Sequence, residues 1–381
     1  MNESDLKKTA MQRAGQKGRA HIVCFDYLRL FAMSSVIFMH TASPLLRGAR
    51  TLGWYGEIVL TALSFSAVPL FFMMSGALLL SSSRTADIRL LWGKRIPRLL
   101  LPLLFWSIAT ILLNRYWGGK TPEESLQSFL AIPHTPAYGH LWYMYTLIAL
   151  YAISPFLYHM VQGMDRRGSV YLAVLIFAIL ALDMLQVLAP PEVRPYLQLN
   201  LASSLRFLET NLFPFLLGLL IFRWGRRIEN WKLIVATLII FGVIVAGTWL
   251  RTRQDGAFNA SFLQQNAGWE ITLASLIFLL AKQILHRPLR LQLSRELVRL
   301  SMPIYLMHNM VKYALWRWGI FAGRFLSLIL VCLLILVISY LVSKTLASVP
   351  GLCWVSTGIP WAEAKDSCSW QATFRRLFKR K

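Results

Sequence analysis

The chain has 381 residues, of which 56% are hydrophobic and 15% charged, and its formal net charge is +23 at pH 7. A mean hydropathy of +0.52 argues against a soluble protein and is typical of a polytopic membrane protein. The positive charge does not indicate a nucleic-acid partner, because the basic residues lie mainly between apolar runs, where topology signals belong.

Each crossing of a bilayer core about 30 Å thick needs roughly 20 mostly apolar residues. The sequence therefore predicts an all-α polytopic bundle of about ten transmembrane helices. The shortest span contains Pro102, so we expect it to be tilted or distorted there. The predicted spans are 22–41, 57–81, 99–114, 140–160, 169–189, 206–223, 231–250, 267–285, 301–319 and 325–346.

The basic residues predict how this bundle is oriented. Assigning the Lys and Arg residues to alternating sides gives about 28 on the side of the N-terminus and about 11 on the other, with Arg29 left inside the membrane. Both termini should thus be cytoplasmic, with a basic N-terminal segment at 1–21 and a Trp-containing basic tail at 347–381. The first apolar run has no small-residue cleavage site before or within it, so we expect it to be kept as a helix. Basic residues beside the helices also attract anionic membrane lipids.

The first predicted helix contains the stretch YLRLFAMSSVIFMH, which carries Arg29 near its start and His40 at its end. Eleven residues are about three helical turns, so both side chains lie on one face, roughly 16 Å apart along the axis. Ionisable residues inside a bilayer are costly and mark functional sites by default. On spacing alone, a second interpretation stays open, in which Arg29 snorkels and His40 caps the helix end.

The second span contains the stretch VPLFFMMSG, with Pro69, Ser75 and Gly76. Such residues kink a membrane helix or let a neighbouring helix approach closely. We interpret Ser75 first as a packing residue and second as a ligand contact.

Arg95 and Arg98 form an R-x-x-R pair on the predicted cytoplasmic side of the third span. Two guanidinium groups three residues apart at a helix start are suited to bidentate contacts with phosphate. The pattern is common in isolation, but its position at the cytoplasmic mouth predicts a docking point for a phosphate-bearing cofactor.

Polar residues also gather near the predicted outer ends of later spans. His140, Trp142 and Tyr143 open the span 140–160, where they fit either an aromatic belt or a platform for stacking a carbohydrate. A polar outer chamber around His40 would gather several of the residues His140, Asp183, Glu209 and Glu270.

His308 lies deeper, seven residues into the span 301–319, and fits either a site residue or a histidine whose hydrogen bonds are satisfied within the bundle.

For the tail, a membrane-surface position of its tryptophans and a disordered chain both stay open. The four cysteines Cys24, Cys332, Cys353 and Cys368 have no metal-like spacing, so we expect neither a metal site nor a disulfide framework.

Taken in order, five features resemble those of acyltransferase family 3, a family of bacterial integral membrane proteins. They are the R-x10-H spacing from Arg29 to His40, the stretch VPLFFMMSG, the Arg95 and Arg98 pair, the stretch HLWYMY, and SMPIYLMH ending at His308. The resemblance covers about residues 22–346. Within the family, the sequence is similar in particular to O-acetyltransferases of the enterobacterial common antigen. It implies ten core helices in the inner membrane and transfer of an acyl group from cytoplasmic acetyl-CoA to a glycan hydroxyl on the periplasmic side.

The same resemblance maps the motif arginine to Arg29, the motif histidine to His40, and the R-x-x-R pair to Arg95 and Arg98. A sugar hydroxyl needs a general base at neutral pH, and histidine suits that role. We therefore expect His40 as the base, with Glu209 or Asp183 as its orienting carboxylate.

The remaining site residues follow from that scheme. Arg29, Tyr305 or His308 would stabilise charge on the thioester oxygen, and Ser75 would line the path of the donor. The acceptor, a glycan or lipid-linked saccharide, would contact His140, Trp142, Tyr143 and Asp183. Direct transfer and an acylated histidine both stay open, as does the oligomeric state. The alternatives to an enzyme are a transporter or flippase for a lipid-linked sugar or small anion, and a structural subunit of an envelope complex.

Overall fold

The computed structural model describes residues 22–47, 52–190, 193, 211–225, 227–264, 267–320, 323 and 325–378. Within these ranges the chain forms helices and no strand, which confirms the predicted all-α fold class. The N-terminal segment 1–21 lies outside the described residues.

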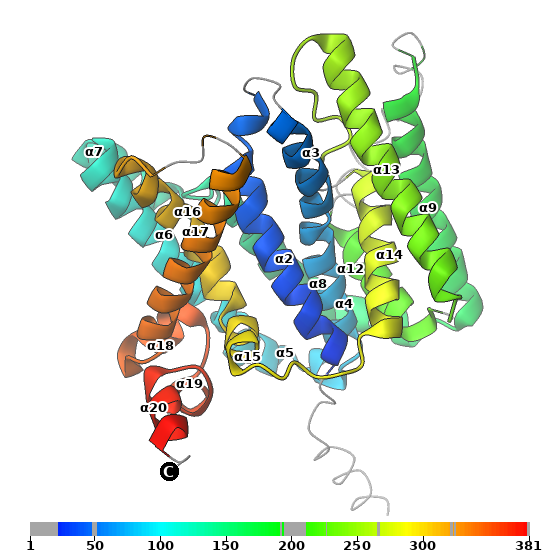
Figure 1. Ribbon diagram of the computed structural model, residues 1–381. Helices are drawn as coiled ribbons and strands as arrows, with labels where there is room; N and C mark the ends of the chain where they lie inside the picture. The colour runs from blue at the N-terminus through cyan, green and yellow to red at the C-terminus, as the bar shows by residue number, and fades with distance from the viewer. Residues whose placement is uncertain are drawn as a thin grey trace, which may run out of the picture.

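The helices that cross the bundle follow the predicted spans, and each of the ten spans contains a described helix (Figure 1). Seven of the described helices are long and apolar enough to cross a membrane, with α3 and α4 counted as one. The helices in the other three spans, α12, α14 and α16, have 13, 17 and 17 residues. In chain order the crossing helices are α2 (Val23–Ala42), α3 (Leu52–Phe65) with α4 (Ala67–Leu80), α6 (Pro97–Gly118), α8 (Trp142–Gln162), α9 (Arg166–Leu188), α12 (Leu212–Trp224), α13 (Asn230–Asp255), α14 (Gly268–Ile284), α16 (Ser301–Arg317) and α17 (Phe325–Leu346).

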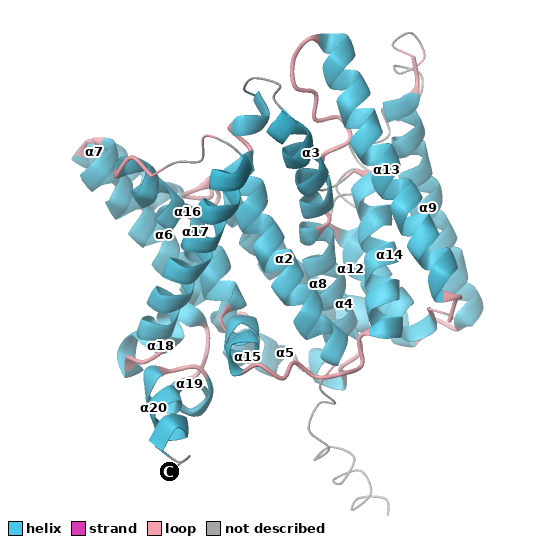
Figure 2. Cartoon of the chain, in the orientation of Figure 1, coloured by secondary structure: helices cyan, strands magenta, loops and turns pink. Residues whose placement is uncertain are grey.

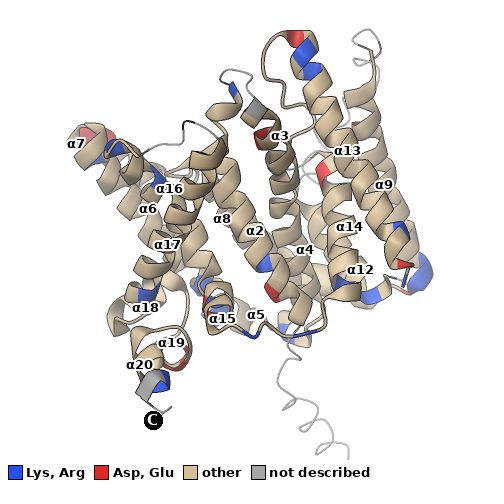
Figure 3. Ribbon diagram, viewed as in Figure 1, with Lys and Arg blue, Asp and Glu red and all other residues tan. Residues whose placement is uncertain are grey.

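Short helices close the two ends of the bundle. The side at which α2 begins and the C-terminal helices end is called the basic side here, and Figure 3 shows Lys and Arg around α12, α15 and these C-terminal helices. The opposite end, with α7, is called the far side. The short helices are η1 (Leu45–Arg47), η2 (Ser83–Thr85), α5 (Ile88–Leu90), the π-helix η3 (Leu91–Arg95), α7 (Pro122–Ala131), η4 (Gly139–Leu141), α15 (Gln292–Arg299), α18 (Pro350–Thr357), α19 (Trp361–Ser367) and α20 (Trp370–Phe378). Figure 2 labels α5, α7, α15, α18, α19 and α20 among them.

The predicted span 57–81 is broken at Ser66, between α3 and α4. Pro69 has no amide hydrogen to donate to the carbonyl of Phe65, and its ring clashes with that carbonyl in a regular helix. At this break the Ser66 hydroxyl donates a hydrogen bond to the carbonyl oxygen of Leu63 at 2.7 Å. The break is thus a proline kink of the kind that the sequence predicts.

The predicted span 99–114 is longer than expected, because α6 runs from Pro97 to Gly118 and contains Pro102. Proline is favoured at the first position of a helix, and Gly119, with φ of 71°, ends it in the left-handed region. The irregular turn comes just before α6, where the Ile96 amide donates to the carbonyl of Leu91 at 2.9 Å in the π-helix η3. Arg95 lies in this π-turn, a form of helix that often occurs at functional sites.

The helices α4 and α12 pack with their backbones in contact. A Cβ atom on Gly76 would lie 1.8 Å from the carbonyl oxygen of Phe215, and one on Gly218 would lie 2.0 Å from that of Met73. Only glycine leaves room for such an approach, as the sequence predicts for Gly76. This contact fixes the position of Ser75, the preceding residue of α4.

The tail is folded within the described residues, because α18, α19 and α20 cover most of 350–378. Cys353, Ala364 and Cys368 are completely buried in it. The disordered alternative therefore does not apply to this part of the tail, which packs beneath α6, α16 and α17 at the basic side (Figure 1).

Candidate active site

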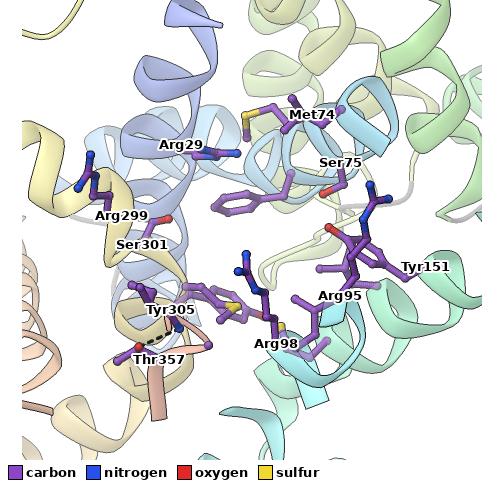
Figure 4. Close-up of a pocket in the computed structure, with 18 of the residues that line it drawn as sticks. Arg29, Met74, Ser75, Arg95, Arg98, Tyr151, Arg299, Ser301, Tyr305 and Thr357 are labelled. Carbon is purple, nitrogen blue, oxygen red and sulfur yellow. Dashed lines mark hydrogen bonds between the residues drawn. The ribbon is translucent and has the colours of Figure 1, made fainter. Parts of the chain in front are cut away.

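A cavity of about 530 Å³ lies at the basic side of the bundle, within the range of small-molecule sites (Figure 4). Its walls come from α2, α4, α6, α8, α15, α16 and the tail. The lining residues predicted from the sequence are Arg29, Ser75, Arg95, Arg98, Tyr143 and Tyr305. The structure thus brings the five predicted donor-binding residues to one cavity, together with Tyr143, which was predicted to contact the acceptor.

Four arginines line this cavity: Arg29, Arg95, Arg98 and Arg299. Arg95 donates a hydrogen bond to the Thr85 hydroxyl at 2.8 Å, which fixes its side chain at the mouth. Several guanidinium groups around one space form a site for a multiply charged anion such as phosphate. Arg299 was not predicted from the sequence, although its position just before the apolar span 301–319 was a signal for it.

The inner end of the cavity is aromatic. The rings of Tyr143 and Tyr305 have centroids 5.5 Å apart, and Phe71 lies 5.9 Å from Tyr143. The Tyr305 hydroxyl donates a hydrogen bond to the backbone carbonyl of His140. The end wall of the cavity is therefore in direct contact with a histidine that lies behind it.

Three histidines from separate elements meet behind this wall: His40 from α2, His140 from η4 and His308 from α16. The ring centroids are 5.3 Å apart for His40 and His308, 6.1 Å for His40 and His140, and 4.9 Å for His140 and His308. The Tyr305 ring lies 5.6 Å from that of His140 and 5.8 Å from that of His308. We call these three residues the histidine cluster.

Backbone carbonyls fix the tautomers of two members of the histidine cluster. His308 Nδ1 lies 2.5 Å from the Tyr305 carbonyl oxygen, and His140 Nε2 lies 3.0 Å from that of Leu306. A carbonyl oxygen only accepts, so these two nitrogens carry the hydrogens of the neutral rings. His308 Nε2 and His140 Nδ1 are buried and have no hydrogen-bond partner among the described residues. Each thus presents a lone pair.

Lys312 joins the two helices that carry His40 and His308. Its Nζ donates to the backbone carbonyl oxygen of His40 at 3.0 Å, and the residue is 8% exposed. Lys312 was not predicted from the sequence, although it follows His308 by four residues and therefore lies on the same face of α16. The buried ammonium group of Lys312 thus adds a positive charge beside the histidine cluster, at the end of the cluster nearer the far side.

Arg29 and His40 lie on one continuous helix, α2, as their spacing requires. Arg29 lines the cavity, while His40, near the end of α2, is partly exposed and contacts the other two histidines. At 1.5 Å per residue the two positions are roughly 16 Å apart along the helix axis. The helix thus connects the cavity at the basic side with the cluster nearer the far side.

The other predicted site residues are placed elsewhere or are not described. Trp142 packs against Phe72, with centroids 6.4 Å apart, and does not line the cavity. Asp183 accepts a hydrogen bond from the amide of Gly268 at 2.7 Å, on a helix, α9, that packs mainly against α12 and α14. It is therefore not brought into the histidine cluster. Glu209 lies outside the described residues.

The chain matches a family described as an acyltransferase domain over residues 22–344, while no curated relative and no solved structure matches it. The narrower similarity to enzymes of the enterobacterial common antigen stays a prediction. The matched range contains the cavity arginines, the aromatic end wall and the histidine cluster, and it ends before the tail. The chain therefore belongs to acyltransferase family 3, and it is a multi-pass membrane acyltransferase.

Proposed function

We propose that the protein transfers an acetyl group from cytoplasmic acetyl-CoA to a hydroxyl of a surface or lipid-linked glycan on the periplasmic side of the bacterial inner membrane. The observation that carries this proposal is the contact between the cavity and the histidine cluster through Tyr305. An arginine-rich anion site and a group of bases thus lie on one route through the bundle.

The cavity suits the donor from mouth to inner end. Arg95, Arg98 and Arg299 are positioned to bind its phosphates at the basic side. Beyond them the lining is largely apolar, which suits the pantetheine arm; it includes Met74, Leu78, Leu99, Met144 and Leu147. The thioester would then lie near Tyr143 and Tyr305, next to the histidine cluster.

In the transfer step the acceptor hydroxyl oxygen attacks the thioester carbonyl carbon. A carbon–oxygen bond forms, the carbon–sulfur bond breaks, and the CoA thiolate leaves. His40 takes the hydroxyl proton as general base and returns it to the departing sulfur, so protons balance. Its partial exposure suits this role, because the acceptor must reach it.

The developing negative charge on the thioester oxygen needs a hydrogen-bond donor. The Tyr305 hydroxyl already donates to the His140 carbonyl, and His308 Nδ1 donates to the Tyr305 carbonyl. Arg29 lines the cavity, and its guanidinium group is a cation that carries five N–H donors. We therefore assign this stabilisation to Arg29.

Sidedness follows from the charge distribution. The cavity mouth lies at the basic side, and the excess of Lys and Arg on the N-terminal side of the membrane favours the cytoplasm for it. Acetyl-CoA is a cytoplasmic metabolite, so the donor enters at the mouth. The histidine cluster, nearer the far side, would meet the glycan from the periplasm.

The test is release of free CoA by the detergent-purified protein, given acetyl-CoA and glycan from the source envelope. We expect release with the wild type, loss with His40→Ala, and normal release with Ser34→Ala, an exposed position on the same helix. Mass spectrometry of surface glycans from cells with and without the gene should show a lost acetyl increment. A wild-type protein that leaves the thioester intact would favour the transporter. Normal acetylation by His40→Ala would show that another group is the base.

A further inference from the structure

The tail forms one wall of the donor cavity, although it lies beyond the family match, which ends at residue 344. Thr357, Gly358, Ile359 and Glu363 all line the cavity. They belong to the end of α18, the following turn and the start of α19. The cavity that the family-matched region builds is thus completed by a segment outside the match.

Two contacts fasten this wall to α6. The Trp106 Nε1 donates to the carbonyl oxygen of Ser356 at 2.9 Å, and both residues are buried. Gly358, with φ of +68°, lies so close to α6 that a Cβ atom there would be 2.3 Å from the carbonyl oxygen of Arg98. The wall therefore contacts the backbone of a residue that we assign to phosphate binding.

A buried carboxylate fastens the tail to the other side of the cavity. Glu296 of α15, 3% exposed, accepts hydrogen bonds from Lys344 Nζ at 2.6 Å and from Arg376 at 2.9 Å. Arg376 lies on α20 and also donates to the carbonyl oxygen of Ser367 at 2.7 Å. Because α15 also carries Arg299, the tail links two arginine-bearing walls of one cavity.

The tail wall differs in charge from the walls it joins. The four lining residues from the tail include no cation. Among the described residues that line the cavity, Glu363 is the single acidic one. Phosphates would be repelled by this carboxylate and held by the arginines opposite. A carboxylate instead accepts hydrogen bonds from an amino group, such as the exocyclic amine of a purine.

We propose that the tail, through Thr357, Gly358 and Glu363, binds the nucleoside end of the acyl-CoA donor and so sets the affinity for its nucleotide half. This inference rests on the proposed function, because it assumes that the cavity binds acyl-CoA. Glu363 accepts from the purine amine, and Gly358 permits the wall to lie against Arg98. The pantetheine half contacts the apolar lining deeper in the cavity and is not bound by the tail.

The experiment measures binding to the purified full-length protein of acetyl-CoA, adenosine 3′,5′-bisphosphate and S-acetylpantetheine, the last two standing for the halves of the donor. In Gly358→Ala the new Cβ forces the wall away from Arg98. We expect its affinity for acetyl-CoA and for the bisphosphate to fall about ten-fold, and its affinity for S-acetylpantetheine to stay unchanged. Glu363→Ala, at an exposed side chain, removes both acceptor oxygens and should show the same pattern even if Gly358→Ala fails to fold.

Two matched variants serve as controls. Gly351→Ala adds a methyl group in α18, the helix that Gly358 follows, with nothing within 4 Å, and Asp366→Ala removes an exposed carboxylate of α19 that does not line the cavity. Both should bind all three ligands as the wild type does. Wild-type affinity for the bisphosphate in Gly358→Ala and in Glu363→Ala would overturn this inference and leave the proposed function standing. A wild-type protein that binds none of the three ligands would overturn the proposed function, and this inference with it.

Discussion

Lys312 of α16 donates a hydrogen bond to the backbone carbonyl oxygen of His40 at 3.0 Å, and so joins the helix that carries His308 to the end of the helix that carries His40. The contact is made to the backbone, so it does not change the hydrogen-bonding capacity of the imidazole. Its effect is on where α2 ends and therefore on how the His40 ring meets the rest of the histidine cluster. Lys312 is in this sense a positioning residue.

Replacing Lys312 by Met keeps the length of the side chain and removes the donor. We expect kcat to fall by up to about a hundred-fold, because a shift of about 1 Å in a catalytic group costs that much. The KM for acetyl-CoA should stay near that of the wild type, since Lys312 does not line the donor cavity. Steady-state kinetics of CoA release measure both constants.

Lys312→Arg retains a donor and should recover part of the lost kcat. A rise in KM with an unchanged kcat in Lys312→Met would instead place Lys312 in donor binding and contradict the positioning role.

Arg98 is expected to act on donor affinity and not on the chemical step, because it lines the cavity mouth. Arg98→Ala should raise the KM for acetyl-CoA by about ten-fold and leave kcat unchanged, the pattern of a uniform binding contact. Lys94→Ala is the matched control, since Lys94 is a neighbouring exposed cation of η3 that does not line the cavity. Equal effects of the two variants would show that only the general positive charge of this side matters.

Hydropathy and residue spacing were enough to predict the helices and the relative placement of Arg29 and His40 along α2. A bilayer demands about 20 apolar residues for each crossing, so the spans could be read from the sequence. A single continuous helix fixes the relation of Arg29 to His40 by its geometry alone. The kink at Ser66 and the close approach at Gly76 follow likewise from local chemistry.

The meeting of His40, His140 and His308 could not be predicted in the same way. Hydropathy gives the depth of a residue but not its neighbours, which depend on how α2, η4 and α16 pack. Asp183 was assigned to the site on depth alone, and it contacts Gly268 of α14 instead. The wall from the tail was missed because its attachment depends on tertiary contacts that no local pattern shows, with Trp106 and Arg98 of α6 and with Glu296 of α15.

Glu296 provides a prediction for the dependence of stability on pH. Burial, the largest single influence, acts to raise the pKa of this carboxyl, but hydrogen bonds from Lys344, Tyr340 and Gln292 together hold it below the ordinary value of 4.5. A carboxyl with a lower pKa in the folded state stabilises the fold fully above its unfolded pKa. That contribution is lost as the pH falls below about 4.5 and through the folded pKa.

We therefore expect Glu296→Gln to lower the free energy of unfolding at pH 7 by about 3 kcal/mol, since it removes one partner of a buried ion pair. The difference in Tm from the wild type should shrink as the pH falls below 4.5. Thermal unfolding in detergent between pH 7 and pH 3 measures both. Glu229→Gln removes an exposed partner of Lys232 and should leave Tm unchanged. A pH-independent difference in Tm for Glu296→Gln would mean that packing, and not charge, is what Glu296 contributes.

Gly76 gives a prediction about the packing that supports the donor cavity. In Gly76→Ala the new Cβ would lie 1.8 Å from the Phe215 carbonyl oxygen, so α4 and α12 must move apart. Such overpacking should lower the free energy of unfolding by about 1–3 kcal/mol. It should also weaken acetyl-CoA binding, because Ser75 moves with α4. Gly242→Ala, on α13 with nothing within 4 Å, should instead be neutral or stabilise its helix by up to about 1 kcal/mol. Wild-type stability of Gly76→Ala would show that the backbones of α4 and α12 are not in contact, since no side-chain adjustment can relieve a clash with a carbonyl oxygen.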